Sequence, residues 1–312
     1  MIEDNFNKIN VCVSCDDNYS KYAGVTIASV LSNAKEDDNI SIYILDGGIK
    51  EEHKEQLLKL KEIKPCEINF VNINEELFNV YKNVKTHKYI SIATYYRLKL
   101  ASMLKDVSKI LYLDCDVVVN TSLAPLLEID LDKNIILGVS DLNKKVVKKN
   151  QNYINAGVAL MDLDKIREEK IEEEFEKYTI EHAAKITCGD QEIINDVLKD
   201  RIKLIDSRWN VQSSNFVNRS SYTNNPKIIH FVAAKKPWHY ASFSIHKNYY
   251  FKYLQLTPWK LNEDELKHWV QDNQIASLFE YFKYRPFFIF RPRFYYALFQ
   301  SYVKPLFKGL KD

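Results

Sequence analysis

The sequence has no excess of charge of either sign. Among its 312 residues, 44 Lys and Arg face 42 Asp and Glu, which leaves a formal net charge of +2. Proteins that bind nucleic acid carry a strong basic field over the binding face. We therefore predict no nucleic-acid partner, and any charged ligand must bind at a local cluster.

Long apolar runs are also missing. Nowhere do about 18 consecutive apolar residues occur, the length that a helix needs to cross a bilayer. The opening MIEDNFNKIN has no basic segment followed by an apolar stretch, so we expect a cytoplasmic protein. Five cysteines are an odd number and lie mostly inside apolar runs, where a free Cys acts as a small hydrophobe. We expect no disulfides.

What the sequence does contain is an alternation of strand and helix patterns. Strands are predicted at 9–15, 39–47, 66–73, 109–119, 134–141 and 153–163. Helices are predicted within 16–34, 51–63, 93–104, 165–184 and 190–200. Alternation of this kind predicts an α/β domain whose central sheet is mostly parallel and covered on both faces.

The character of the chain changes near residue 263. We predict a catalytic domain over 8–262 and a helical appendage over 263–312, which is basic, aromatic and broken by prolines. Seven Lys and Arg between 283 and 311 alternate with Phe and Tyr, a pattern that suits peripheral attachment to an anionic membrane surface. The alternative is that this segment packs on the domain or on another subunit.

Asp114 and Asp116 interrupt the apolar run KILYLDCDVVVN, which otherwise reads as a central strand. Unpaired buried charge there would cost several kcal/mol. Two residues apart, both carboxylates can face one side of the strand, where a divalent metal would compensate them. The alternative is a pair of loop aspartates that cap a turn.

The same motif, an apolar run followed by two aspartates, is found near the start of haloacid-dehalogenase-type phosphohydrolases. In that class the first Asp is the nucleophile and the second is the general acid. That class needs a later acidic pair for its Mg²⁺. Asp190 and Asp196 are six residues apart instead of the usual four or five, and the pair at Asp114 comes late in the chain. This class is therefore disfavoured.

Six segments occur in the order found in family 8 glycosyltransferases, and the chain resembles that family from about residue 9 to about residue 260. The segments are SCDDNY, ISIATYYRLKL, LYLDCDVVV, YINAGVALMDL, DQEIIN and HFVAAKKPWHY. The family comprises retaining sugar transferases, including bacterial lipooligosaccharide galactosyltransferases and glycogenin. The resemblance implies a GT-A fold, a Rossmann-like sheet that binds a nucleotide sugar at its DxD motif.

The resemblance also implies a role for individual residues. Metal ligands would be Asp114, Asp116 and His230, and the ion Mn²⁺, with Mg²⁺ as the alternative. Lys236 would bind the diphosphate, and Ala233 stands where the family usually has Gly. The donor-binding set would be Ser14, Asp16, Asn18, Arg97, Asp114, Cys115, Asp116, Asp141, Asn155, Ala156, Asp190, Gln191, His230, Ala233 and Lys236.

Within that set, Asp190 and Gln191 are the expected catalytic residues, and Gln191 would lie near the anomeric carbon. An amide is a poor nucleophile, so we favour a front-face mechanism over double displacement. Taken alone, several of these residues have plain structural interpretations: Asp16 and Asp190 as helix caps, Arg97 as a surface ion pair, Asn155 as part of a turn.

We expect a metal-dependent enzyme that transfers galactose or glucose from a UDP-sugar to a surface glycan, glycoprotein glycan or glycolipid. Such an enzyme suits bacterial lipopolysaccharide or capsule synthesis at the inner face of the cytoplasmic membrane. A glycogenin-like enzyme that glucosylates itself is an alternative, because 20 tyrosines offer acceptors. A nucleotide-sugar-binding protein without turnover is another. Acceptor contacts come from variable loops, so the sequence leaves the acceptor open.

Overall fold

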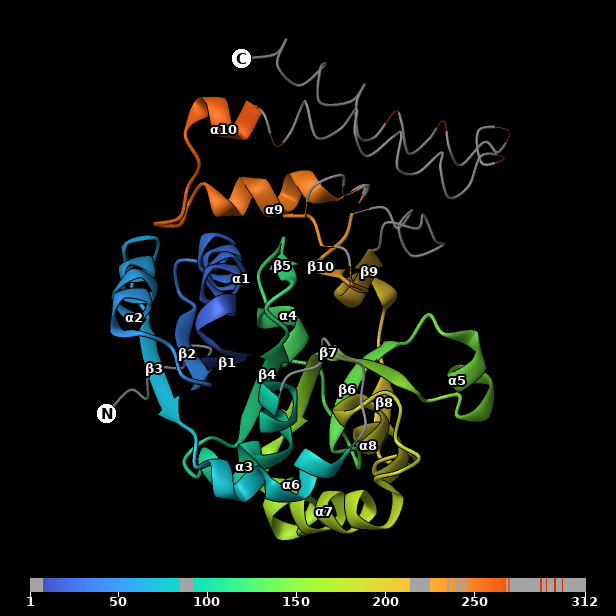
Figure 1. Cartoon of the computed structure of the whole chain (residues 1–312). Coiled ribbons are helices and arrows are strands. Elements are labelled where there is room, and N and C mark those ends of the chain that lie inside the picture. The colour runs from blue at the N-terminus through green and yellow to red at the C-terminus, as the bar shows by residue number, and fades with distance from the viewer. Residues whose placement is uncertain are drawn as a thin grey trace.

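The computed structural model describes residues 8–84, 92–213, 225–234, 236–239 and 246–267, with the single residues 242, 244, 269, 287, 290, 295 and 299. A seven-stranded sheet, in the order β3-β2-β1-β4-β7-β6-β8, forms the centre (Figure 1). Its strands are β1 (Lys8–Cys15), β2 (Asn39–Asp46), β3 (Glu67–Asn72), β4 (Lys109–Leu113), β6 (Ile136–Ser140), β7 (Ile154–Asp162) and β8 (Ile202–Leu204).

The large sheet is mostly parallel, as the sequence predicts. The pairs β1–β2, β2–β3, β1–β4 and β6–β8 are parallel, whereas β7 runs antiparallel to both β4 and β6. Because β7 runs against its neighbours, its first residues lie at the edge where the parallel strands end. Ligand sites of open α/β sheets form at that edge.

A smaller sheet of three strands, in the order β5-β10-β9, corrects one prediction. Residues 109–119 do not form one strand: β4 belongs to the large sheet, and β5 (Val117–Val119) pairs with β10 (Ile228–Phe231) in the small one. The third strand is β9 (Val211–Ser213). Asp114 and Asp116 mark the break, because two buried charges are costly inside a continuous ladder and the chain turns there instead.

Helices cover both faces of the large sheet. The α-helices are α1 (Ser20–Ser32), α2 (Glu51–Leu58), α3 (Leu100–Met103), α4 (Ala124–Leu127), α5 (Lys144–Lys149), α6 (Leu163–Glu168), α7 (Ile171–His182), α8 (Asp190–Val197), α9 (Lys247–Leu254) and α10 (Glu263–Lys267). The 3₁₀ helices are η1 (Asp17–Tyr19), η2 (Lys59–Glu62), η3 (Glu75–Asn83), η4 (Ile92–Lys99) and η5 (Ser207–Asn210).

Two apolar cores lie on the two faces of the sheet. On one face Val11 and Val13 of β1 pack with Ile27 of α1 and Leu57 of α2. On the other face lie α3, α6, α7 and α8, where Phe175 is fully buried. Each such side chain contributes about 1.5–3 kcal/mol by leaving water. These cores hold the strand ends in place around the site.

The cysteines match their prediction, whereas two predicted helices are each divided in the structure. All five cysteines are free, as expected. The predicted helix over 165–184 is two helices, α6 and α7, separated at Lys170, whose φ is 55°. The predicted helix over 93–104 is the 3₁₀ helix η4 followed by α3, and Arg97 Nε donates to Thr94 O there. That side-chain bond occupies a carbonyl that a regular α-helix would use itself.

Most of the predicted appendage lies outside the described residues. Helix α10 forms its start, and the four described positions beyond residue 280 are exposed aromatics, Phe287, Phe290, Tyr295 and Phe299. Within the part of the chain that the structure describes, no helix is long and apolar enough to span a bilayer. The prediction of a boundary near residue 262 remains a prediction.

Candidate active site

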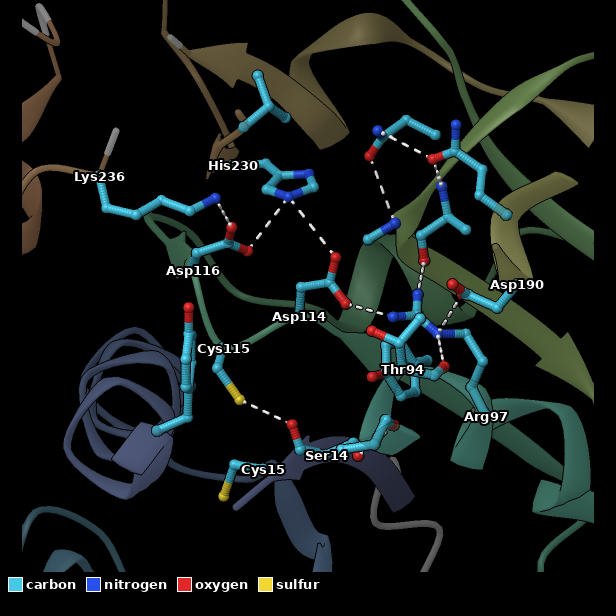
Figure 2. A pocket seen from close by; sticks show the side chains of 18 of the residues that line it. Ser14, Cys15, Thr94, Arg97, Asp114, Cys115, Asp116, Asp190, His230 and Lys236 are labelled. Carbon is cyan, nitrogen blue, oxygen red and sulfur yellow. Dashed lines mark hydrogen bonds and ion pairs between the residues drawn. The ribbon is translucent and has the colours of Figure 1, made fainter. Parts of the chain in front are cut away.

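The carboxyl ends of the parallel strands and the start of β7 surround a cavity of about 460 Å³ (Figure 2). Thirteen predicted donor-binding residues line it: Ser14, Asp16, Arg97, Asp114, Cys115, Asp116, Asn155, Ala156, Asp190, Gln191, His230, Ala233 and Lys236. These residues come from segments more than 200 positions apart, and the fold brings them to one place.

Two predicted residues do not line the cavity. Asn18 lies in η1 and is exposed. Asp141 follows β6 and lies behind the lining, where its Oδ2 accepts hydrogen bonds from Gln191 Nε2 and Asn155 Nδ2, each at 3.2 Å. Asp141 can therefore act on a ligand through its neighbours, whereas the structure gives Asn18 no contact with the cavity.

Asp114, Asp116 and His230 converge on one point, with one candidate ligand atom of each within 4.8 Å of the others. His230 Nε2 lies 3.2 Å from Asp116 Oδ1 and 3.7 Å from Asp114 Oδ2. Asp116 Oδ1 is buried and accepts no hydrogen bond from the described residues. Two carboxylates and an imidazole that face each other in this way fit a divalent cation such as Mn²⁺.

Buried hydroxyls of α1 fix the backbone around the two aspartates. Thr26 Oγ1 donates to Cys115 O at 3.2 Å or to Val117 O at 2.7 Å, and Ser29 Oγ accepts from Val119 N at 2.8 Å. These bonds satisfy backbone groups that leave the sheet ladder at the break between β4 and β5. Helix α1 thus holds the turn that presents the carboxylates.

Gly157 leaves room for the side chains of Asp114 and His230. A Cβ added to Gly157 would lie 2.2 Å from His230 Cε1 and 2.5 Å from Asp114 Oδ2. Real Cβ atoms do not approach other atoms so closely, and neither side chain can move away easily, because Asp114 is paired with Arg97 and His230 is buried. Strand β7 can pass directly behind the His230 and Asp114 side chains only because residue 157 has no side chain.

Arg97 is the central cation of the cavity floor. Its guanidinium contacts Asp114 Oδ1 at 2.6 Å and Asp190 Oδ2 at 2.9 Å, donates to Ala156 O at 2.7 Å and lies 4.0 Å from the Tyr112 ring centre. Burial opposes its charge, but the two carboxylates raise the pKa of Arg97 above its usual range. Arg97 is therefore a buried, always charged clamp, and not a surface ion pair.

Asp190 opens α8 and is 5% exposed. Burial raises its pKa from 3.8 to about 6; Arg97 acts in the opposite direction, and the nearby Asp114 charge adds to the rise. A carboxyl group with a pKa near neutrality, in a cavity and beside a cation, is typical of a functional position.

Lys236 approaches the carboxylates from the opposite side. Its Nζ forms an ion pair with Asp116 Oδ2 and donates to Phe231 O at 2.8 Å. Burial alone would raise the pKa of Asp116, but Lys236 and His230 hold it well below the usual range. The Lys236 loop also contains Ala233, whose φ of 70° is a value that Gly adopts readily. The backbone path expected for Gly is thus kept with Ala.

Several lining residues are not among the predicted ones. They are Cys15, Tyr19, Ala93, Thr94, Tyr112, Gly157, Cys188, Val232 and Ala234. Most adjoin a predicted residue, so proximity in sequence was the available signal. Tyr19 is also part of the segment SCDDNY that matches the family, and in the structure this residue is 42% exposed.

The later acidic pair that a phosphohydrolase would need is not assembled here. Asp190 lines the cavity, but Asp196 is bound instead by the Tyr178 hydroxyl at 2.5 Å and is not among the lining residues. One carboxylate of that pair is therefore directed elsewhere.

Comparison with known proteins agrees with this geometry. The chain is 28% identical over 270 residues to general stress protein A of Bacillus subtilis, covering 79% of this chain and 93% of that one. It is 26% identical to lipopolysaccharide 1,2-glucosyltransferase of Escherichia coli K12, covering 81% and 79%. Among solved structures, galactosyltransferase LgtC in complex with donor and acceptor sugar analogs superposes with a TM-score of 0.70 at 28% identity, covering 82% of this chain and 98% of that one.

The fold is thus of the GT-A-like α/β type. The family model described as glycosyl transferase family 8 matches residues 10–242, a range that contains every lining residue of the cavity. A match over that much of the chain, together with the shared fold, shows that the protein belongs to glycosyltransferase family 8.

Proposed function

We propose that the protein is a metal-dependent, retaining α-glycosyltransferase that moves galactose or glucose from UDP to a glycan or glycolipid acceptor. The observation that carries the proposal is that one cavity contains both a group able to hold a cation and, beside it, polar side chains able to hold a sugar. Asp114, Asp116 and His230 form the first part, and Asp190 and Gln191 line the second. A nucleotide sugar needs both, because its diphosphate is anionic and its hexose is neutral and hydroxylated.

The cation site receives the diphosphate. Asp114, Asp116 and His230 would hold the ion, which when bound supplies positive charge for the leaving diphosphate. Lys236, already at Asp116, would add a second positive charge to the same phosphates. The left-handed backbone at Ala233 brings the chain close to the cavity at this point.

The nucleoside end of the donor would lie toward β1. The half-exposed Tyr19 ring offers a face on which a base can stack, worth about 1–3 kcal/mol for stacked bases in general. Ser14 and Asp16 line the same end and carry oxygens for hydrogen bonding to uracil or ribose.

The available carboxylates favour a front-face reaction. Among the described residues that line the cavity, the carboxylates are Asp16, Asp114, Asp116 and Asp190. Asp114 and Asp116 belong to the cation site, and Asp190 is paired with Arg97. Asp16 lies at the nucleoside end. No carboxylate of this set is therefore free to form a covalent sugar intermediate, and in a front-face reaction the departing diphosphate oxygen takes the proton of the acceptor hydroxyl.

The acceptor would be a surface glycan or a glycolipid, reached by peripheral binding at the inner face of the cytoplasmic membrane. The names of the relatives support lipopolysaccharide synthesis: they include a lipopolysaccharide 1,2-glucosyltransferase and a lipopolysaccharide 1,3-galactosyltransferase of Salmonella typhimurium. The basic aromatic sequence beyond residue 262, with four described aromatics exposed, supports the membrane contact.

Release of UDP is the direct test. UDP-galactose, UDP-glucose and UDP-N-acetylglucosamine are incubated with the protein in Mn²⁺, in Mg²⁺ and in EDTA, and free UDP is measured. We expect turnover of one of the first two sugars with Mn²⁺ and loss of turnover in EDTA. Full activity in EDTA, or binding of every donor without turnover, would contradict the proposal.

A further inference from the structure

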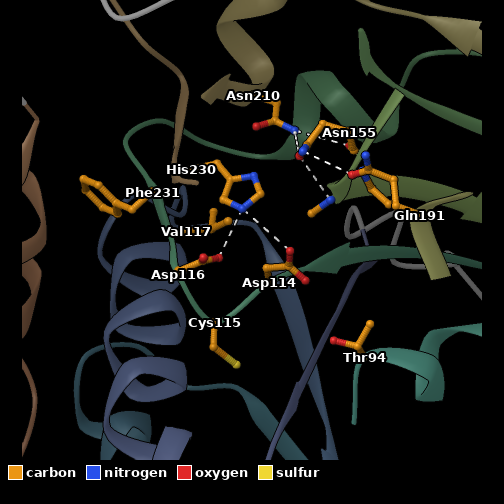
Figure 3. A network of polar contacts seen from close by, with 12 residues as sticks. Thr94, Asp114, Cys115, Asp116, Val117, Asn155, Gln191, Asn210, His230 and Phe231 are labelled. Atoms are coloured by element: carbon orange, nitrogen blue, oxygen red, sulfur yellow. Dashed lines mark hydrogen bonds and ion pairs between the residues drawn. The ribbon is translucent and has the colours of Figure 1, made fainter. Parts of the chain in front are cut away.

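The carboxamide of Gln191 is held in one orientation by groups of fixed polarity (Figure 3). Its Oε1 accepts from the Ala156 backbone N–H at 3.1 Å and from Asn155 Nδ2 at 3.2 Å. Its Nε2 donates to Asp141 Oδ2 at 3.2 Å. A backbone N–H can only donate and a carboxylate can only accept. The Ala156 and Asp141 contacts therefore require the same orientation of the Gln191 amide, with its oxygen toward Ala156 and its nitrogen toward Asp141. Both acceptor positions of the Gln191 oxygen are thereby occupied.

Asn155 is oriented by the same reasoning. Its Nδ2 donates to Asp141 Oδ2 and to Gln191 Oε1, and its Oδ1 accepts from the Gly157 backbone N–H at 3.3 Å. Reversal of the Asn155 amide would turn its oxygen toward a carboxylate and a carbonyl oxygen. Such a reversal would also remove one of the two hydrogen bonds that Gln191 Oε1 accepts, so Asn155 contributes to holding the Gln191 carboxamide in place.

Asn210 fixes Asn155 from behind the cavity. Its Nδ2 donates to Asn155 Oδ1 at 3.0 Å and to the Asn155 backbone O at 3.4 Å. Asn210 is 1% exposed and is not among the lining residues, so it does not meet a ligand in the cavity. Its own Oδ1 is buried without a hydrogen-bond partner among the described residues. A buried unpartnered oxygen costs about 1–3 kcal/mol, so the amide group of Asn210 does not serve stability through that atom.

The position of Asn210 in the fold also connects the two parts of the site. Asn210 ends η5 and directly precedes β9, which pairs with β10 such that Gln212 lies opposite His230. Gln212 in turn accepts from Leu142 N at 3.2 Å and donates to Ser140 O at 2.9 Å, on both sides of Asp141. The segment from Asn210 to Gln212 thus bonds to Asn155 and to the residues on both sides of Asp141. The side chains of Asn155 and Asp141 both contact the Gln191 carboxamide.

We propose that Asn210 is a positioning residue for sugar transfer: by fixing the Asn155 amide, it keeps the Gln191 carboxamide in the orientation in which its oxygen is fully hydrogen-bonded. The inference rests on the proposed function, because it assigns Gln191 to the reaction. Gln191 then acts as an immobilised polar side chain that lines the sugar-binding part of the cavity, and not as a nucleophile.

A double-mutant cycle in donor hydrolysis tests the proposal, with UDP-galactose and UDP-glucose as the probes in Mn²⁺. Asn210→Ala should lower kcat about tenfold and change KM for the donor less than about threefold, because a misplaced polar group acts mainly on the reacting geometry. Asn210→Leu, close to Asn in shape, removes the donor without opening a cavity and should show the same loss. Combined with Gln191→Ala, Asn210→Ala should add less than about twofold, because both act through one group.

The matched control is Asn10→Ala. Asn10 is buried at the opposite end of β1, where its Nδ2 donates to Lys109 O at 3.2 Å and its Oδ1 is unpartnered among the described residues. It should lower the melting temperature about as much as Asn210→Ala and leave kcat at the wild-type value. If neither Asn210 variant lowers kcat, or if their losses multiply with that of Gln191→Ala, the positioning role is wrong. If the wild-type protein turns over neither donor, the proposed function itself fails.

Discussion

Replacing Lys236 with Met should separate metal binding from catalysis, because it should strengthen the first and weaken the second. The Lys236 ammonium is bound to Asp116, one of the three groups that converge for a cation. Met keeps most of the length and apolar contact of the side chain and removes only the charge. A cation that binds Asp116 would then no longer share this carboxylate with an ammonium, nor be repelled by it.

The contact is substantial, because both side chains are only 14% exposed. A hydrogen bond to a charged group contributes about 1.5–3 kcal/mol, and each 1.4 kcal/mol is a factor of ten in an equilibrium constant. Without nucleotide, we therefore expect Lys236→Met to bind Mn²⁺ about tenfold or more tightly than the wild-type protein. Donor turnover should fall, because the same charge is missing when the diphosphate leaves.

Electron paramagnetic resonance of free Mn²⁺, titrated with protein at pH 7.5, gives the affinity without any enzymatic assay. Lys54→Met is the control, since Lys54 pairs with Asp46 at 2.8 Å and does not line the cavity. That variant should bind Mn²⁺ as the wild type does. Unchanged or weaker Mn²⁺ binding by Lys236→Met would show that the lysine does not compete for Asp116.

Four further predictions address other parts of the molecule. Asp116→Asn should abolish Mn²⁺-dependent turnover and weaken UDP binding in Mn²⁺ but not in EDTA, as measured by calorimetry; equal losses in both buffers would exclude a ligand role. Gly157→Ala should displace His230, weaken Mn²⁺ binding at least tenfold and lower the melting temperature; wild-type affinity would contradict the packing described. Burial raises the folded-state pKa of Asp190 to about 6, so the stability that its protonated form contributes is fully present only below its unfolded pKa of 3.8 and is lost as pH rises through 6, by about 3 kcal/mol in total. In urea unfolding without metal, the free energy of unfolding of Asp190→Asn should therefore rise relative to that of the wild type as pH increases from 3 to 7. If the two proteins show the same dependence on pH, the raised pKa is wrong. Protein ending at residue 262 should lose co-sedimentation with anionic liposomes and keep donor hydrolysis; if the full-length chain also ignores such liposomes at low salt, the membrane contact is wrong.

The sequence predicts the layers of this fold well, because burial patterns are local. Alternating strands and helices indicate the parallel sheet, and two aspartates in an apolar run indicate the candidate cation site. What the pattern cannot reveal is where a chain changes sheets. Residues 109–119 read as one strand because apolar residues flank Asp114 and Asp116 on both sides, and the pairing of β5 with β10 depends on residues more than 100 positions away.

Hydrogen bonds that hold the site residues in place are also hard to predict, because they join residues far apart in the sequence. Thr26 reaches Cys115 across 89 positions, and Asn210 reaches Asn155 across 55. Thr26 and Asn210 are common residue types, and the sequence around them does not indicate these contacts. Asn18 is the opposite case: its segment matches the family, yet it is exposed in η1 and does not line the cavity, so its contact with the donor stays a prediction.

The candidate cation ligands are divided between two sheets, which has a consequence for how the molecule unfolds. Asp114 directly follows β4 of the large sheet, whereas His230 belongs to β10 of the small one. Three short strands have little independent stability, so the small sheet depends on its neighbours to persist. An ion held by Asp114 and His230 would tie the two sheets together as a reversible cross-link. Amide hydrogens of β5, β9 and β10 should then exchange more slowly with Mn²⁺ present, while those at the far edge of the large sheet, in β3, exchange at an unchanged rate.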